Sequence, residues 1–170
     1  ETIKPLFEKD AFAMANLSAE VPWSNWDYIP GMLMVAILLA YVVVMRKRAS
    51  SGLKVLFIGS GIWVFVTLIF FIGKVERISQ RASIEFFESQ VGQEVYVTTF
   101  GYKSYVPWFY AEIQPHNNTK ATDGHWLLYG DTDKPVMISA KITSKEKLEA
   151  EITDAVFLYE KNGFLFYRRN

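Results

Sequence analysis

The chain has 170 residues, of which 18 are Lys or Arg and 18 are Asp or Glu, so its formal net charge is zero. This balance argues against a nucleic-acid-binding protein, which normally needs a basic face. Cysteine is absent, which excludes disulfide bonds and thiol chemistry. The sequence starts at Glu1 rather than Met and shows no signal-peptide pattern, so we expect a piece of a longer or processed chain.

Two uncharged apolar stretches dominate the first half of the chain. They run from Tyr28 to Met45 and from Val55 to Ile72. At a helical rise of about 1.5 Å per residue, each is long enough to cross a hydrocarbon core of roughly 30 Å. The alternative is a pair of buried helices in a large soluble core, but a soluble helix usually keeps a polar stripe. The sequence therefore predicts two transmembrane helices within residues 28–73.

The link between the two stretches, residues 46–54, sets their orientation. It carries no acidic residue and four basic ones, which are Arg46, Lys47, Arg48 and Lys54. The positive-inside rule places such a link in the cytoplasm. Residues 1–27 are then the end of an outer, periplasmic loop, and residues 74–170 form a periplasmic domain. Basic residues directly after the second stretch reduce this charge bias, and Glu76 and Glu85 partly offset them.

Small residues interrupt the second apolar stretch at Gly59, Ser60 and Gly61. Small side chains let a neighbouring helix approach closely, so this segment is a candidate helix contact. Local flexibility in a lipid-facing helix is an equally good interpretation.

The first half of the predicted domain alternates helix and strand. Apolar residues recur at helical spacing from Lys74 to Gln90, which predicts an amphipathic helix. Glu94 to Phe100 is β-branched and aromatic and predicts a strand. Ser104 can cap a helix that has Pro107 in its first turn and runs to about Ile113. Residues 114–124 are rich in turn-forming residues and predict a loop.

The second half predicts a strand, a helix and a hairpin. Pro135 to Ile142 is the strand, and Thr143 and Glu146 have the spacing of a capping box for the helix that follows. Asn162-Gly163 is a dipeptide favoured in tight hairpin turns. Because the first two strands enclose a helix, they resemble a βαβ unit. The predicted fold class is a transmembrane α-helical hairpin followed by a small α/β or α+β domain.

The sequence contains no established catalytic or phosphate-loop signature. His116 and His125 lie in or beside the polar loop, where histidines are usually solvated, so we predict no metal site. The acidic residues near the C-terminal end are interspersed with lysines, as on a solvated helix face. We therefore assign no catalytic residue and no cofactor to this chain.

The stretch after the first predicted strand is the best candidate for a ligand site. Gly101 ends the strand, Lys103 adds a positive charge, and Ser104 and Tyr105 lie at the start of the predicted helix. Free backbone N–H groups at a helix start, together with a lysine, could hold a phosphate or a carboxylate. Two other interpretations stay open. In the first, Gly101 serves only the turn, Lys103 is solvated, and the aromatic residues that pack on the sheet are Tyr105, Trp108 and Phe109. In the second, the aromatic residues that rest on lipid headgroups are Tyr102, Trp108 and Tyr110.

Several segments together resemble a known family. They are KPLFEKDAFAMANLSAEVPWSNWDYIPG, the two apolar stretches with their basic link, VYVTTFGYKSYVPWFY, DKPVMISAKI and YEKNGFLFYRR. This combination, which covers nearly the whole chain, resembles the C-terminal part of bacterial membrane glycosyltransferases. The family is the protein O-mannosyltransferase-like and aminoarabinose-transferase-like one, in versions typical of the Bacteroidetes.

The resemblance implies a multi-span enzyme of the bacterial inner membrane. Such an enzyme moves a sugar from a polyprenyl-phosphate carrier to a periplasmic acceptor, and its catalytic carboxylates lie in its first outer loop, which has no counterpart here. Expected partners are the lipid bilayer, upstream transmembrane helices and the carrier-linked sugar, which Lys103 would contact through its phosphate. A divalent metal in the parent enzyme is left open. The alternative is a non-enzymatic, two-span membrane-anchored module that binds a partner or helps assemble an envelope complex.

Overall fold

The computed structural model describes residues 7–113 and 118–170. The described chain forms two compact units. Residues Glu20 to Arg77 make up one, which we call the hairpin unit. The described residues before Glu20 and after Arg77 make up the other, which we call the α/β unit. Two long apolar helices followed by a small mixed α/β domain confirm the predicted fold class at this level.

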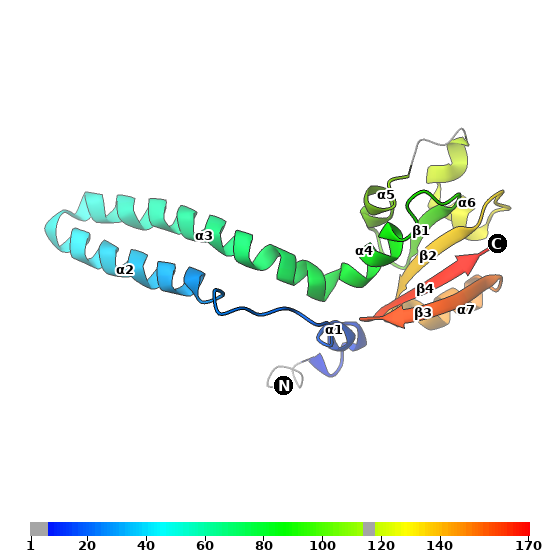
Figure 1. The fold of residues 1–170 in the computed structure, drawn as a ribbon, viewed down its shortest axis with the longest axis horizontal. Coiled ribbons are helices and arrows are strands. Elements are labelled where there is room, and N and C mark those ends of the chain that lie inside the picture. Colours follow the sequence, from blue (N-terminus) through cyan, green and yellow to red (C-terminus); the bar gives the residue numbers. More distant parts are fainter. Residues whose placement is uncertain (1–6, 114–117) are drawn as a thin grey trace. The chain divides into compact units, whose positions relative to one another are not determined.

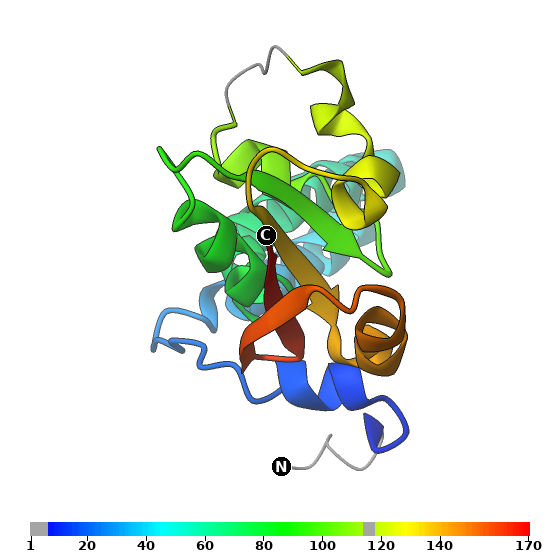
Figure 2. The same ribbon diagram turned by 90° about the vertical axis from the view of Figure 1, so that its right-hand side faces the viewer.

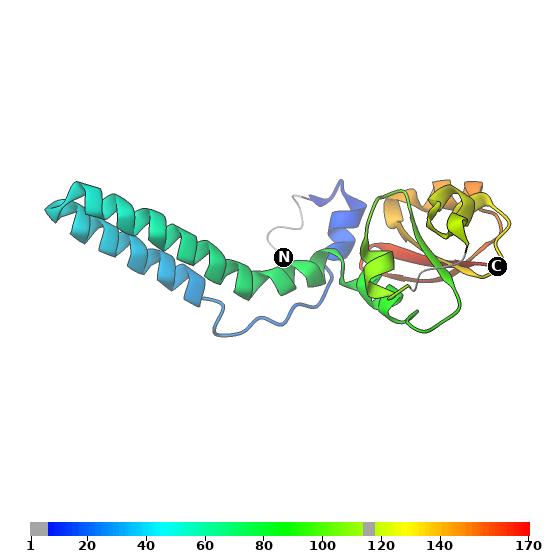
Figure 3. The ribbon, with the colours of Figure 1, turned by 90° about the horizontal axis from the view of Figure 1, so that it is seen from above.

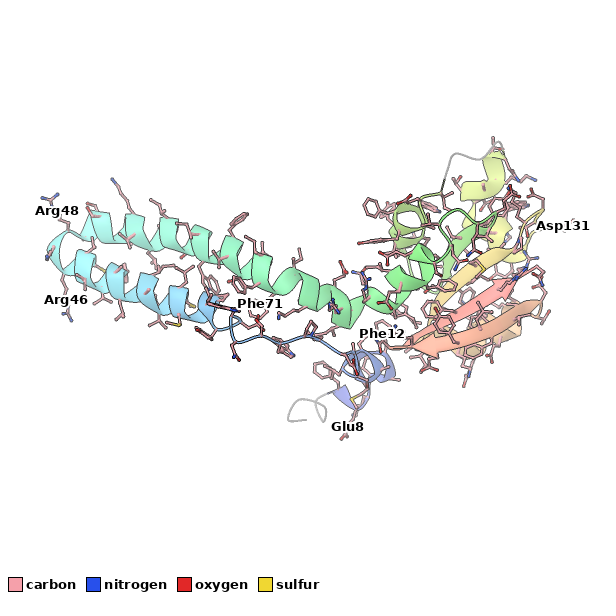
Figure 4. The ribbon with its side chains drawn as sticks, viewed as in Figure 1. Glu8, Phe12, Arg46, Arg48, Phe71 and Asp131 are labelled. Atoms are coloured by element: carbon pink, nitrogen blue, oxygen red, sulfur yellow. The ribbon has the colours of Figure 1, made fainter. Side chains whose placement is uncertain are left out.

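The hairpin unit consists of α2 (Ile29–Lys47) and α3 (Ala49–Ser79), which lie side by side (Figure 1). Arg46 and Arg48 lie at the closed end of the hairpin (Figure 4). Both helices are long and apolar enough to cross a membrane, and almost none of their surface is buried. This exposed apolar surface indicates membrane association.

Close packing between α2 and α3 depends on one of the predicted small residues. A Cβ added at Gly59 would lie 2.5 Å from Ile37 Cγ2, whereas one at Gly61 would meet nothing within 4 Å. Ser60 donates a hydrogen bond to the carbonyl of Leu56 in its own helix. The predicted helix contact is therefore confirmed at Gly59, and its partner is the other helix of the same hairpin.

Polar contacts tie the open end of the hairpin together. Lys74 Nζ lies 2.8 Å from Asp27 Oδ2, donates to the carbonyl of Pro22 at 2.8 Å, and lies 5.0 Å from the centre of the Trp23 ring. The hydrogen bond from the Lys74 ammonium holds the pKa of Asp27 below its usual value. Trp63 Nε1 donates to the carbonyl of Pro30 at 2.9 Å. These bonds connect the chain entering α2 to the later part of α3.

The predicted amphipathic helix over residues 74–90 is interrupted. Helix α3 continues to Ser79, the backbone breaks at Gln80 (φ −142°, ψ −13°), and α4 spans Arg81–Glu88. Phe86 and Phe87 of α4 are fully buried, as their helical spacing predicts. The break lies just inside the α/β unit, which resumes at Ile78, so the single predicted helix extends over parts of both units.

A four-stranded mixed sheet organises the α/β unit. Its strands are β1 (Tyr96–Phe100), β2 (Val136–Lys141), β3 (Ala155–Lys161) and β4 (Phe164–Arg169), in the order β1-β2-β4-β3. Strands β1 and β2 are parallel, with Phe100 opposite Ala140, which confirms the predicted βαβ unit. Strand β4 is antiparallel to both of its neighbours.

Helices cover both faces of this sheet, because side chains alternate along each strand. On one face, Leu165 and Tyr167 belong to a core cluster that includes Leu127 of α6 (Gly124–Tyr129) and Leu148 of α7 (Lys145–Glu151). On the other face, Phe164 and Phe166 pack with α4 and with residues of α5 (Val106–Tyr110). Figures 2 and 3 show the sheet between these two helix layers.

Two local predictions differ from the structure. The predicted capping box does not form, because a 3₁₀ turn (Ile142–Ser144) precedes α7 and makes Ser144 the N-cap, without a side-chain hydrogen bond. The predicted loop contains a second 3₁₀ turn (Thr119–Thr122) and ends in α6, which Asp123 caps by accepting a bond from the His125 N–H. His116 lies outside the described residues. Leu148 of α7 and Ile152, which follows it, are buried.

An unpredicted helix, α1 (Ala11–Asn16), packs against the turn of the β3–β4 hairpin. Asp10 caps it by accepting a bond from the Ala13 N–H at 2.9 Å. The rings of Phe12 and Phe164 meet edge-to-face, with centroids 5.1 Å apart. A segment that precedes the apolar helices therefore belongs to the same compact unit as the C-terminal domain (Figure 1).

The turn itself confirms the predicted Asn-Gly hairpin. Asn162 has a φ of 48° and Gly163 a φ of 78°, the left-handed conformations that a tight primed turn requires. A Cβ at Gly163 would also lie 3.0 Å from the Ala15 Cβ and 3.1 Å from Phe12 Cδ2. Glycine is needed here both for the turn and for the approach of α1.

We predict that Gly163→Ala lowers the melting temperature of the chain more than Gly92→Ala does. Both glycines have nearly the same φ, 78° and 76°, so both variants carry a left-handed strain of about 1–2 kcal/mol. A Cβ at Gly92 meets nothing within 4 Å, whereas one at Gly163 must displace α1. Thermal unfolding followed by circular dichroism in detergent measures the difference. Equal losses in the two variants would show that α1 does not pack on the turn.

Candidate functional site

The turn after β1 begins at Gly101, as the sequence predicts. Gly101 has a φ of 77°, and a Cβ there would overlap the hydroxyl of Ser144. Thr99 Oγ1 donates to the carbonyl of Tyr102 at 2.8 Å and closes the turn. Gly101 is thus required by backbone conformation and by the close approach of the segment before α7.

The helix that follows is shorter than the sequence predicts. Helix α5 has five residues, ends at Tyr110 rather than near Ile113, and has Tyr105 as its N-cap. Ser104 Oγ accepts a hydrogen bond from the Val106 N–H at 3.1 Å. Pro107 lies in the first turn, as predicted. Because a five-residue helix has a small dipole, the charge of Lys103 and the surrounding cavities become the stronger basis for a ligand site.

Two cavities flank Lys103, and Tyr102, Lys103 and Ser104 line both. The first, which we call the lysine cavity, has a volume of about 320 Å³. The second, which we call the α5 cavity, has a volume of about 450 Å³ and is also lined by Tyr105 and Trp108. The structure therefore places three of the four predicted site residues, Lys103, Ser104 and Tyr105, at cavities.

The lysine cavity combines positive charge with neutral hydrogen-bonding groups. Its lining contains two ammonium groups and no carboxylate. The remaining lining is made of hydroxyl, amide and apolar groups from α1, the α3–α4 break, α4, the β1–α5 turn, α5 and β4. The full set is Phe12, Ser79, Gln80, Ser83, Tyr102, Lys103, Ser104, Val106, Lys141 and Phe164. Such a lining suits an anion that also carries hydroxyl groups.

Lys141 is held by aromatic rings. Its Nζ lies 4.6 Å from the centre of the Phe12 ring and 5.5 Å from that of Tyr102, within range of cation–π attraction. Phe12 comes from α1, so a segment that precedes the apolar helices forms part of the cavity wall. The two rings orient the ammonium, and no carboxylate among the cavity's lining residues neutralises its charge.

Three hydroxyl groups form a buried cluster beside Lys141. Tyr102 Oη lies 2.9 Å from Ser139 Oγ and 3.3 Å from Ser83 Oγ, and the two serine oxygens are 3.3 Å apart. Ser83 and Ser139 are buried. Burial raises the pKa of Tyr102, and its hydrogen bonds with the two serines oppose this shift. At neutral pH the tyrosine is therefore a neutral hydroxyl that can share hydrogen bonds with its neighbours.

Sequence reasoning missed Lys141, although a usable signal was present. The predicted βαβ unit makes β1 and β2 parallel, so their C-terminal ends meet at one edge of the sheet. Gly101 and Lys103 follow the end of β1, and Lys141 is the last residue of β2. Comparing the two strand ends would have paired these lysines. Phe12 and Ser83 gave no such signal.

The acidic residues near α7 have structural partners. Tyr167 Oη donates to Glu149 Oε1 at 3.0 Å, and Tyr129 Oη donates to Glu151 Oε2 at 2.6 Å. Arg169 pairs with Asp154 at 2.7 Å. In residues 7–113 and 118–170, no group of three or more His, Asp or Glu side chains could hold a metal ion. The rings of His125 and Tyr129 meet at a tilt of 47°, with centroids 4.9 Å apart.

Comparisons with protein-family models, curated proteins and solved structures give no significant match to this chain. The fold, the apolar helices, the lysine cavity and the resemblance of the quoted segments are therefore the basis for proposing a function.

Proposed function

We propose that α2 and α3 cross a bacterial inner membrane as a hairpin and that the α/β unit lies in the periplasm. The observation that carries this proposal is a pair of exposed helices with long uncharged stretches, whose flanking segments belong to one compact unit. The uncharged parts, Tyr28 to Met45 and Val55 to Ile72, are each about 27 Å long at a helical rise of about 1.5 Å per residue. That length matches a hydrocarbon core of roughly 30 Å.

The flanking segments support an even number of crossings. Helix α1 precedes α2, and α4 follows α3, yet both belong to the α/β unit. A single compact unit lies on one side of a membrane, so a chain that leaves it through α2 must return through α3. The basic link at residues 46–54 then lies on the opposite side, and its charge favours the cytoplasm.

Residues at the open end of the hairpin suit a membrane–water interface. Trp23 and Trp26 are exposed there. Lys74, which lies two residues beyond the second uncharged stretch, pairs with Asp27. Tryptophan rings are enriched at headgroup level, and a lysine at a helix end can keep its ammonium in the polar region. The Lys74–Asp27 pair would also offset the basic charge that follows the second stretch.

We further propose that the chain is the C-terminal part of a membrane glycosyltransferase that uses a polyprenyl-phosphate-linked sugar. This rests on the resemblance of the quoted segments and fits a hairpin followed by a small α/β domain. In this role the chain supplies no catalytic carboxylate. It supplies a membrane anchor and a cavity in which Lys103 contacts the carrier phosphate. Lys141 and the hydroxyl cluster extend the same cavity.

The intact protein from its source membrane tests the enzymatic role. An antibody raised against residues 74–170 should detect a polypeptide several times heavier than 19.5 kDa, because the proposed enzyme needs further transmembrane helices. The immunopurified protein should transfer sugar from a polyprenyl-phosphate donor. A native band at about 19.5 kDa, or a heavier protein with no transfer from any such donor, would contradict the proposal. A light band would favour the two-span anchored binding module.

We predict that Lys103→Ala in the full-length enzyme weakens donor binding at least about tenfold, since a hydrogen bond to a charged group contributes about 1.5–3 kcal/mol. Lys147→Ala is the matched control, because Lys147 lies on α7, its side chain is 70% exposed, and it lines neither cavity. Titration of the purified variants with donor measures the affinity. Unchanged donor affinity in Lys103→Ala would remove Lys103 from the phosphate site.

A further inference from the structure

Helix α5 is apolar on both of its faces. Val106 and Tyr110 pack against the core cluster under the sheet. Tyr105 and Phe109 point away from the core and are 82% and 74% exposed, and Trp108 is 45% exposed. The rings of Tyr105 and Trp108 meet with centroids 6.2 Å apart. A helix that is apolar all round normally packs against other groups on every side. The exposed aromatic face of α5 is therefore expected to have a binding partner.

The composition of this face matches lipid headgroups. Tryptophan and tyrosine have an apolar ring and a polar atom, and they concentrate where a membrane meets water. The exposed Lys103 lies two residues before Tyr105 and adds a positive charge that complements anionic lipid. Phe109 supplies an apolar ring able to enter the boundary between headgroups and acyl chains.

The chain connections keep the α/β unit near any membrane that the hairpin crosses. Only five residues lie between Ile72, the end of the second uncharged stretch, and Ile78, the first residue after the hairpin unit. This segment is helical, so the six steps from Ile72 to Ile78 cover about 9 Å at a rise of about 1.5 Å per residue. A second connection, before α2, limits the freedom of the unit further.

We infer that Tyr105, Trp108 and Phe109 insert into the headgroup region of the bilayer that α2 and α3 cross. This inference rests on the proposed membrane crossing. Of the three residues that the sequence suggested for lipid contact, it keeps Trp108. It replaces Tyr102 and Tyr110 with Tyr105 and Phe109. Tyr102 belongs to the hydroxyl cluster, and Tyr110 packs against the core. Contact with lipid would hold the entrance of the α5 cavity, lined by Tyr105 and Trp108, at the membrane surface.

Fluorescence quenching in proteoliposomes tests this inference. Because the chain has no cysteine, Tyr105→Cys and Phe109→Cys each accept a single bimane label. The vesicles contain phosphatidylcholine, phosphatidylglycerol and a lipid with a spin label near its headgroup. We expect at least twofold stronger quenching at positions 105 and 109 than in the control Val156→Cys. Val156 lies on strand β3 and is 55% exposed.

A further variant separates this inference from the proposal beneath it. Leu39→Cys lies in α2, is 63% exposed, and should be quenched by a spin label deep in the acyl chains. Quenching at Leu39 with none above the Val156 level at positions 105 and 109 would overturn the lipid contact alone. Blue-shifted emission without quenching at 105 would mean that the face packs against protein, which also overturns it. No quenching at Leu39 would overturn the membrane crossing, and the lipid contact with it.

Discussion

Uncovered apolar surface on two long helices is the constraint on which the rest of this structure depends. Helices α2 and α3 contain two long uncharged stretches. Their buried residues are nevertheless only Pro30, Gly52 and Gly59. Backbone hydrogen bonds are satisfied inside each helix, so an apolar environment can surround them without leaving polar groups unpaired. Water cannot serve as that environment without a large loss of hydrophobic free energy. The helices therefore need a membrane or a large partner, and their hairpin returns the chain to the unit it left.

That return explains how the lysine cavity is assembled. Phe12 comes before the apolar helices, and Ser83, Lys103 and Lys141 come after them. The parallel pairing of β1 and β2 brings the two lysines to one edge of the sheet, and α1 closes the cavity with an aromatic ring. All residues that line the cavity belong to the α/β unit, although the apolar helices separate Phe12 from the others in the sequence.

The sequence predicted features that depend on composition or on special backbone geometry. Uncharged stretches, β-branched strands and the positive φ values of Asn162 and Gly163 are local properties, and each was found. Helices of five or six residues, such as α5, α6 and α1, were mispredicted or missed. Isolated helices of that length are unstable, and tertiary packing decides where they form. The break at Gln80 likewise reflects the passage from an exposed apolar helix to a buried one, which a single periodic pattern does not mark.

The location of the hairpin link tests the membrane hairpin most directly. Single-cysteine variants Ser50→Cys, in the basic link, and Lys147→Cys, on α7, can be compared in spheroplasts with a membrane-impermeant maleimide. Both positions are exposed, so differences in labelling report the side of the membrane. The account predicts that Lys147→Cys is labelled at once and Ser50→Cys only after the membrane is permeabilised. Labelling of Ser50→Cys in sealed spheroplasts would contradict it.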